Sequence, residues 1–159
     1  MQEPPNFGYL LVDVSRLYLR GFAREAGTLG FTLPESKALG YLARNQGISQ
    51  AGLAELCDIE PMTLGRILDR MEADGWIERR TALRDRRVRC LYLKAPAQSI
   101  LDELGQIGAA LREAATTGVA ASDLEGFIRV LSHMYEQLSA ADAASAARAQ
   151  APPRPELSS

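Results

Sequence analysis

DIEPMTLGRILDRMEADGWIERRTALRDRRVRCLYL, residues 58–93, is the stretch that decides how the rest of this chain is interpreted. Its first part predicts a short amphipathic recognition helix over about residues 61–74, because apolar side chains recur at helical spacing at Leu64, Ile67, Leu68 and Met71. Pro61 suits the first turn, where the missing N–H has no helical partner. The opposite face carries Met62, Thr63, Arg66 and Arg70. Gly75 predicts the end of the helix, since glycine accepts a left-handed conformation.

Two strand-like runs follow this helix, residues 76–81 and 88–93, joined by the arginine-rich turn ALRDRR. A helix followed at once by a hairpin with a basic tip is typical of a winged helix-turn-helix. The preceding segment agrees, because Ser49 predicts the N-cap of another short helix that ends near Cys57. Only residues 58–60 separate the two helices, which matches the tight turn of a helix-turn-helix.

The charge of this region differs from that of the whole chain. Residues 61–94 contain nine Lys/Arg and five Asp/Glu, a local net charge of +4, whereas the chain carries −2 and its remainder therefore −6. A basic patch on an acidic protein is expected of a DNA-binding face, since affinity for DNA comes largely from neutralising phosphates. A solvated surface hairpin is the alternative, and we favour DNA because charge, helix and hairpin agree.

Composition limits the other functions. The 159 residues, 47% hydrophobic and 24% charged, suit one globular domain or two fused subdomains. There is no apolar run of about 18 residues and no secretory signal in MQEPPNF, so a cytoplasmic location is expected. With one histidine, His133, and no hydrolase, kinase or dinucleotide motif, we expect no enzyme, no metal site and no cofactor.

Helices with apolar seams flank the central module at both ends. We expect dimerisation helices at residues 7–31 and 97–140, a DNA-binding domain at 32–95, and a disordered tail at 141–159. Within the central domain, Thr32 and Glu35 predict a capping box at the start of its first helix. The seams exceed what a small monomer buries, which predicts a homodimer that reads a palindromic operator. The expected fold is therefore mainly α with a small β-wing.

Two further sets of residues have alternative interpretations. Arg16 and Arg20 lie four residues apart on the first helix, most simply as a solvated face, or else as the cationic wall of a pocket for an anionic ligand. Cys57 and Cys90 do not form a disulfide framework, and burial is the favoured interpretation for both. A thiol-redox switch that uses one of them is the second candidate function, and a helical interaction module that binds an acidic partner is the third.

The order of elements and the segment IEPMTLGRILDRMEADGWIERR resemble the MarR family of bacterial transcription regulators, most closely its SlyA-like branch, over about residues 8–140. The family's wing motif, an acid followed after one residue by arginine, matches Asp85-Arg86-Arg87. The resemblance implies that Arg87 enters the minor groove, oriented by Asp85, while Thr63 and Arg66 face the major groove.

Arg70, Arg84 and Arg86 complete the expected DNA contacts. The resemblance also implies a regulator, expected to be a repressor, with an arginine-tipped wing over residues 79–93. Its expected input is a small aromatic or anionic molecule bound between the dimerisation helices and the DNA-binding module. The family's usual Leu-Thr after the wing is replaced here by Leu93-Lys94-Ala95-Pro96, so the threonine cap of the next helix is missing.

Overall fold

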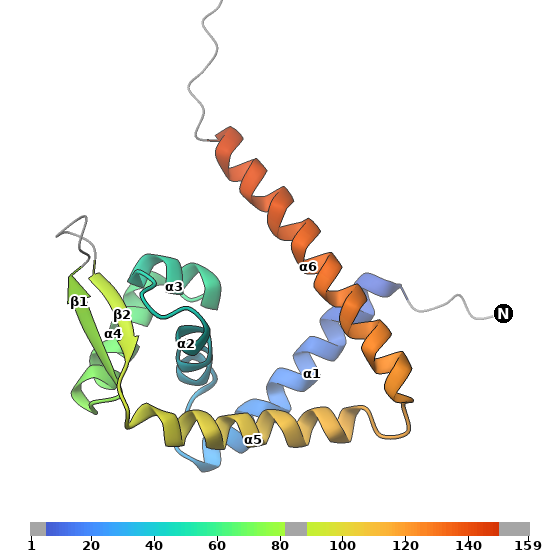
Figure 1. Cartoon of the computed structure of the whole chain (residues 1–159), viewed down its shortest axis with the longest axis horizontal. Helices are drawn as coiled ribbons and strands as arrows, with labels where there is room; N and C mark the ends of the chain where they lie inside the picture. The colour runs from blue at the N-terminus through green and yellow to red at the C-terminus, as the bar shows by residue number, and fades with distance from the viewer. Residues whose placement is uncertain (1–5, 82–88, 150–159) are drawn as a thin grey trace, which may run out of the picture. The chain divides into compact units, whose positions relative to one another are not determined.

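The computed structural model describes residues 6–81 and 89–149. The order of elements is α1 (Phe7–Thr28), α2 (Leu33–Arg44), α3 (Gln50–Cys57), α4 (Pro61–Ala73), β1 (Ile77–Thr81), β2 (Arg89–Leu93), α5 (Ala97–Ala115) and α6 (Ala121–Ala149). The chain divides into a unit of residues 1–115 and a second unit of residues 116–159. Helices with one small antiparallel hairpin make a winged-helix fold, which confirms the predicted fold class (Figure 1).

The helix starts of the first unit follow from local side-chain chemistry. At α2, the Thr32 N–H donates to the Glu35 carboxylate at 2.9 Å and the Glu35 N–H donates to the Thr32 hydroxyl at 3.4 Å, so the predicted capping box is present. At α3, the Ser49 hydroxyl accepts from the Gly52 N–H at 3.1 Å, as predicted. Each cap satisfies backbone donors that the helix itself leaves without partners.

Helix α4 begins at Pro61, as predicted, but its N-cap is Glu60. The Glu60 carboxylate accepts the Thr63 N–H at 2.8 Å. Three members of the predicted apolar stripe, Leu64, Leu68 and Met71, are fully buried, and Ile67 packs against the core from a half-buried position. Gly75 follows the helix with φ +76°, a left-handed conformation that glycine adopts without steric cost.

The hairpin pairs β1 with β2 in antiparallel register, from Ile77 opposite Leu93 to Thr81 opposite Arg89. Strand β1 begins one residue later than the sequence indicates, and Val88, the expected first residue of the second strand, lies outside the described residues. The loop between α2 and α3 bonds to the middle of β2, since the Gly47 N–H donates to the Leu91 carbonyl at 2.8 Å and the Leu91 N–H donates to the Ile48 carbonyl at 2.9 Å. Gly47 has φ +87° and lies against the Tyr92 hydroxyl, where a Cβ would come within 3.2 Å.

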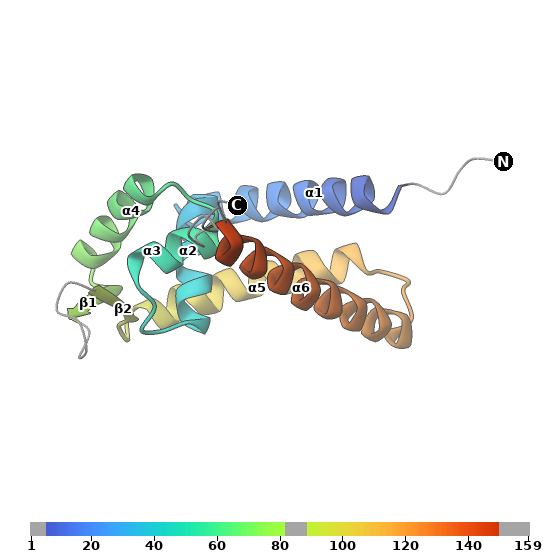
Figure 2. The same cartoon turned by 90° about the horizontal axis from the view of Figure 1, so that it is seen from above.

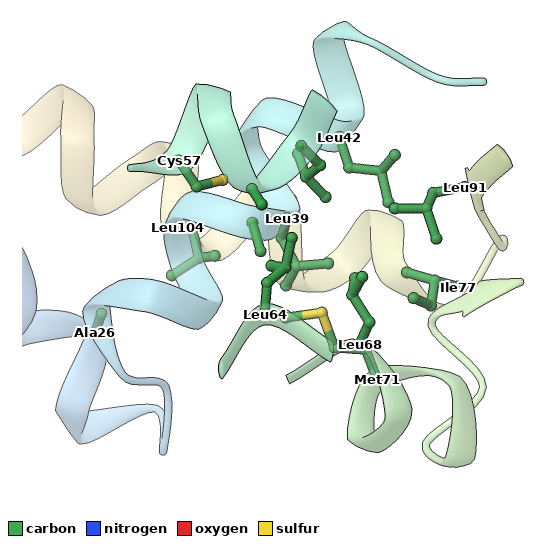
Figure 3. Packing of buried hydrophobic residues seen from close by; sticks show 13 residues of the cluster. Ala26, Leu39, Leu42, Cys57, Leu64, Leu68, Met71, Ile77, Leu91 and Leu104 are labelled. Atoms are coloured by element: carbon green, nitrogen blue, oxygen red, sulfur yellow. The ribbon is translucent and has the colours of Figure 1, made fainter. Parts of the chain in front are cut away.

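Every element of the first unit contributes to one hydrophobic core. Figure 3 shows residues from several helices and both strands around Leu39, among them Leu64, Leu68, Ile77 and Leu91. Helix α4 and the hairpin lie together beside the start of α5, into which β2 leads (Figures 1 and 2). The core therefore fixes one face of α4 and leaves the other exposed.

The second unit is described by a single long helix, α6, of 29 residues. It continues to Ala149 and so includes residues 141–149 of the segment that was expected to form a disordered tail. Alanine has the highest helix propensity, and the sequence here is rich in it, which explains why the helix continues. Residues 150–159 lie outside the described part. Within the described residues, none of the helices has the length and apolar character needed to cross a membrane.

Candidate nucleic-acid interface and adjoining cavities

The outward face of α4 gathers the predicted DNA-reading side chains of the helix. Thr63, Arg66 and Arg70 are all exposed, one helical turn apart in succession, while the opposite side of the helix is buried in the core. Arg66 forms no ion pair with any residue that the structure describes. Its guanidinium is therefore available to a ligand that approaches this face.

Arg70 is attached to the protein interior, which the sequence did not predict. One terminal nitrogen of its guanidinium lies 2.6 Å from a carboxylate oxygen of Glu35, the capping residue of α2. The Arg70 side chain is 54% exposed and that of Glu35 only 6%. A buried carboxylate of α2 is thus paired with an arginine on the outer face of α4.

Arg79 connects the hairpin to the same helix. Its guanidinium pairs with Asp69 at 2.7 Å and with Glu72, and its backbone N–H also donates to Glu72, at 3.1 Å. The Arg79 side chain is only 14% exposed. This arginine contributes to the charge count of the basic patch, but its donors are directed to α4.

Arg80 is also engaged within the protein. It pairs with Glu78 of its own strand and lies over the ring of Tyr92, 4.4 Å from the ring centroid, at a distance suited to a cation–π interaction. Of the basic residues of the patch that the structure describes, Arg70, Arg79 and Arg80 therefore have ion-pair partners within the fold. The wing-tip residues Arg84, Asp85, Arg86 and Arg87 lie outside the described residues.

The N-terminus of α4 carries a perturbed carboxyl group. Hydrogen bonds from the backbone N–H groups of Met62 and then Thr63 lower the pKa of Glu60 below its ordinary value, and the nearby Arg66 contributes in the same direction. Glu60 is thus held ionised where the helix exposes its first amides. The α4 start presents an acid beside the expected DNA face.

The two cysteines have different surroundings. Cys57 is fully buried, and burial raises the pKa of its thiol, although the positive charge of Lys37 partly opposes that shift. Lys37 itself donates to the backbone carbonyl of Cys57 at 2.6 Å, at the end of α3. Cys90 is half-buried on β2. A buried, protonated thiol is a poor redox sensor, which agrees with the favoured interpretation of Cys57.

Two hollows adjoin the first helix. An open groove of about 670 Å³ on α1 is lined by both Arg16 and Arg20 among apolar side chains, so the structure brings these two predicted ligand residues together. Arg16 is paired there with Asp13 at 2.9 Å. The sequence did not predict that Asp13 pairs with one of these two arginines.

The second hollow, of about 620 Å³, lies between α1, α2 and α5. Its lining includes the aromatic rings of Tyr18, Phe22 and Tyr41 and the basic groups of Lys37 and Arg44. We name it the α1–α2–α5 cavity. A ligand site between the dimerisation helices and the DNA-binding module was expected, but none of these residues was predicted to line it, because they come from helices far apart in the chain.

A helix-turn-helix whose second helix exposes one face, followed by an antiparallel hairpin, defines the winged-helix class of proteins. Residues 29–88 match the sequence profile of the MarR family. A Thauera aromatica transcriptional regulatory protein for the hcr operon is 32% identical over 121 residues, 74% of this chain and 72% of that protein. The chain belongs to the MarR family of transcription regulators.

Solved structures share the fold. A MarR family regulator from Silicibacter pomeroyi matches with a TM-score of 0.71 and 25% identity, over 80% of this chain and 86% of that one. A Mycobacterium tuberculosis MarR family protein matches with a TM-score of 0.68 and 23% identity, over 81% of this chain and 98% of that one.

Proposed function

We propose that this protein is a dimeric transcriptional repressor that reads a palindromic DNA operator with α4 and the wing. The observation that carries the proposal is the outward face of α4, where Thr63 and Arg66 are exposed and Arg66 has no ion pair among the described residues. In this assignment Thr63 and Arg66 face the major groove. Arg70, Arg84 and Arg86 contact the DNA backbone, and Arg87, oriented by Asp85, enters the minor groove.

Exposed apolar side chains support a dimer. Helix α1 exposes Phe7, Leu10, Val14 and Leu17, and α6 separately exposes Phe127, Ile128, Val130 and Leu138. Such surfaces are rare on a monomer in water and are expected where a second copy covers them. A two-fold dimer would present two copies of α4 to successive major grooves of a palindrome.

A small aromatic anion is the proposed input. The α1–α2–α5 cavity offers aromatic walls with the basic groups of Lys37, Arg44 and Arg112, a combination that suits a ring with a carboxylate. The solved structure of the Mycobacterium tuberculosis protein is a complex with p-aminosalicylic acid, so that compound is a suitable first ligand with which to probe this cavity. The groove with Arg16 and Arg20 remains the second candidate for the anion.

Within the family, the recognition segment and the wing motif support a place in the SlyA-like branch.

The test compares Arg66→Ala with the wild type on an operator mapped upstream of the protein's own gene and on random duplex of equal length. An arginine that reads guanine contributes about 1–3 kcal/mol of discrimination, so the preference for operator should fall about fivefold or more. Arg24→Ala, an exposed α1 arginine paired with Glu25, is the matched control and should leave that preference unchanged.

Equal losses of affinity on both duplexes would limit Arg66 to a phosphate contact. If the wild type binds neither duplex at low salt, the DNA-binding function itself is wrong, and the interaction module with an acidic partner becomes the better candidate.

A further inference from the structure

Glu35 is the one strongly buried acid that the structure describes, and capping alone does not explain its position. Its two carboxylate oxygens have separate partners: one accepts the Thr32 N–H at 2.9 Å, and the other lies 2.6 Å from the Arg70 guanidinium. Ordinary capping at the third position of a helix needs only the first of these contacts. The second crosses from α2 to the recognition helix.

The carboxylate is held firmly. Glu35 is 4% exposed, and its own backbone N–H donates to the Thr32 hydroxyl, so both its main chain and its side chain are bound to the start of α2. A buried charge is costly unless it is paired, and Arg70 supplies the opposite charge. The carboxylate is therefore a fixed point to which the arginine is attached.

Arg70 keeps free surface beyond this contact. A guanidinium has five N–H donors in a planar fork, and one terminal nitrogen lies 2.6 Å from the Glu35 carboxylate, while the Arg70 side chain remains 54% exposed. A free arginine side chain loses rotamer entropy when it is immobilised on a phosphate. Part of that loss is already incurred in the free protein if the ion pair restrains the side chain.

We infer that Glu35 is a positioning residue for DNA binding, which fixes the Arg70 guanidinium on the outer face of α4 so that its remaining donors meet a DNA phosphate. This rests on the proposed function, because it assigns a role within the same DNA-binding face. The opposite effect has a physical basis as well: a carboxylate near a phosphate repels it, and pairing neutralises the arginine. Removing the Glu35 carboxylate should therefore lower DNA affinity if its main effect is to position Arg70, and raise DNA affinity if its main effect is to repel phosphate.

Glu35→Gln is the decisive variant. Glutamine still caps a helix at this position through its amide oxygen, but its uncharged amide no longer forms an ion pair with Arg70. We expect operator and random DNA affinity to fall together, about threefold to tenfold, because the freed side chain must be ordered on binding. The slope of log affinity against log salt should stay near that of the wild type, since the same number of phosphates is neutralised.

The double-mutant cycle with Arg70→Met separates positioning from a structural role. Arg70→Met alone should weaken binding and lower the salt slope by about one unit. In that background Glu35→Gln should have no further effect on affinity, because Glu35 acts only through the arginine. A further loss in the double variant would mean that Glu35 shapes α4 independently, and the inference would be wrong.

Spectroscopy gives a second readout. The side-chain ¹H–¹⁵N signal of Arg70 in the DNA-free protein should show restricted motion in the wild type and lose that restriction in Glu35→Gln. Glu35→Asp, whose shorter carboxylate is charged but cannot span Thr32 and Arg70 together, should weaken DNA binding as Glu35→Gln does.

Tighter or unchanged DNA binding by both Glu35 variants, with thermal unfolding that shows a folded protein, would overturn the inference while leaving the DNA-binding function intact. If neither variant folds, the role of Glu35 is in the fold and the inference is also wrong. Failure of the wild type to bind any duplex would instead refute the proposed function.

Discussion

Replacing Arg79 by methionine tests whether a basic residue in a basic patch is a DNA contact or a structural brace. The side chain is 14% exposed, and its guanidinium pairs with Asp69 at 2.7 Å and with Glu72. Methionine retains much of the buried aliphatic stem and removes only the charge and the donors. The hydrogen bond from the Arg79 backbone N–H to Glu72 is unaffected by the substitution.

The expected cost follows from the exposure of the partners. Asp69 is 72% exposed and Glu72 40%, so solvent screens both pairs, and each contributes roughly 0.2–1 kcal/mol as surface pairs do. The free energy of unfolding should therefore fall by about 1 kcal/mol, measured from the urea midpoint. At the same time the salt slope of DNA binding should not change, because a guanidinium that is directed to α4 neutralises no phosphate.

The control is Arg89→Met, on the neighbouring strand, where the arginine is exposed and has no ion pair with a described residue. It should lower the salt slope by about one unit if it faces DNA, with little effect on unfolding. A full unit lost in Arg79→Met, with an unchanged urea midpoint, would refute the brace and return Arg79 to the DNA contacts.

Three other predictions concern single positions. Gly47→Ala should lower the free energy of unfolding in urea by about 1–3 kcal/mol, since alanine is strained at φ +87° and its Cβ would lie 3.2 Å from the Tyr92 hydroxyl. The control is Gly105→Ala in α5, where an added Cβ would meet no atom within 4 Å, and this variant should be neutral or stabilising. The Cys57 thiol, whose pKa burial raises, should react with a thiol reagent at neutral pH only as fast as the protein opens, and fast labelling of the folded protein would contradict this. The lowered pKa of Glu60 means that its carboxylate stabilises the fold above the unfolded-state pKa, and that this effect is lost as the pH falls through the folded-state pKa. The Glu60→Gln variant should therefore unfold more easily than the wild type at neutral pH and equally easily in strong acid. An equal difference in stability at both pH values would disprove the assignment.

The sequence alone was sufficient for elements that short-range chemistry controls. Thr32 with Glu35, Ser49, Pro61 and Gly75 mark helix ends through contacts within a few residues, and the structure has each of them where the pattern predicts. The apolar stripe of α4 likewise predicts its buried face, because the helical period alone places those side chains on one side. These local signals were enough to predict the winged-helix fold.

The sequence was less informative where the local signal is weak. Glu60 is not a preferred N-cap residue, so the cap of α4 was not predicted. The alanine-rich segment 141–149 has no apolar stripe, and its helix depends on backbone propensity rather than on packing.

Only the tertiary structure decided which charges remain available to a partner. Arg70 pairs with Glu35 across α2 and α4, Arg79 with acids of α4, and Lys37 with the carbonyl of Cys57. Each contact joins residues from different elements, so it depends on how those elements pack and not on any spacing in the chain. Residues 61–94 include nine basic residues. The packing of the elements determines that Arg79 is paired with acids of α4, whereas Arg66 has no ion pair with any described residue.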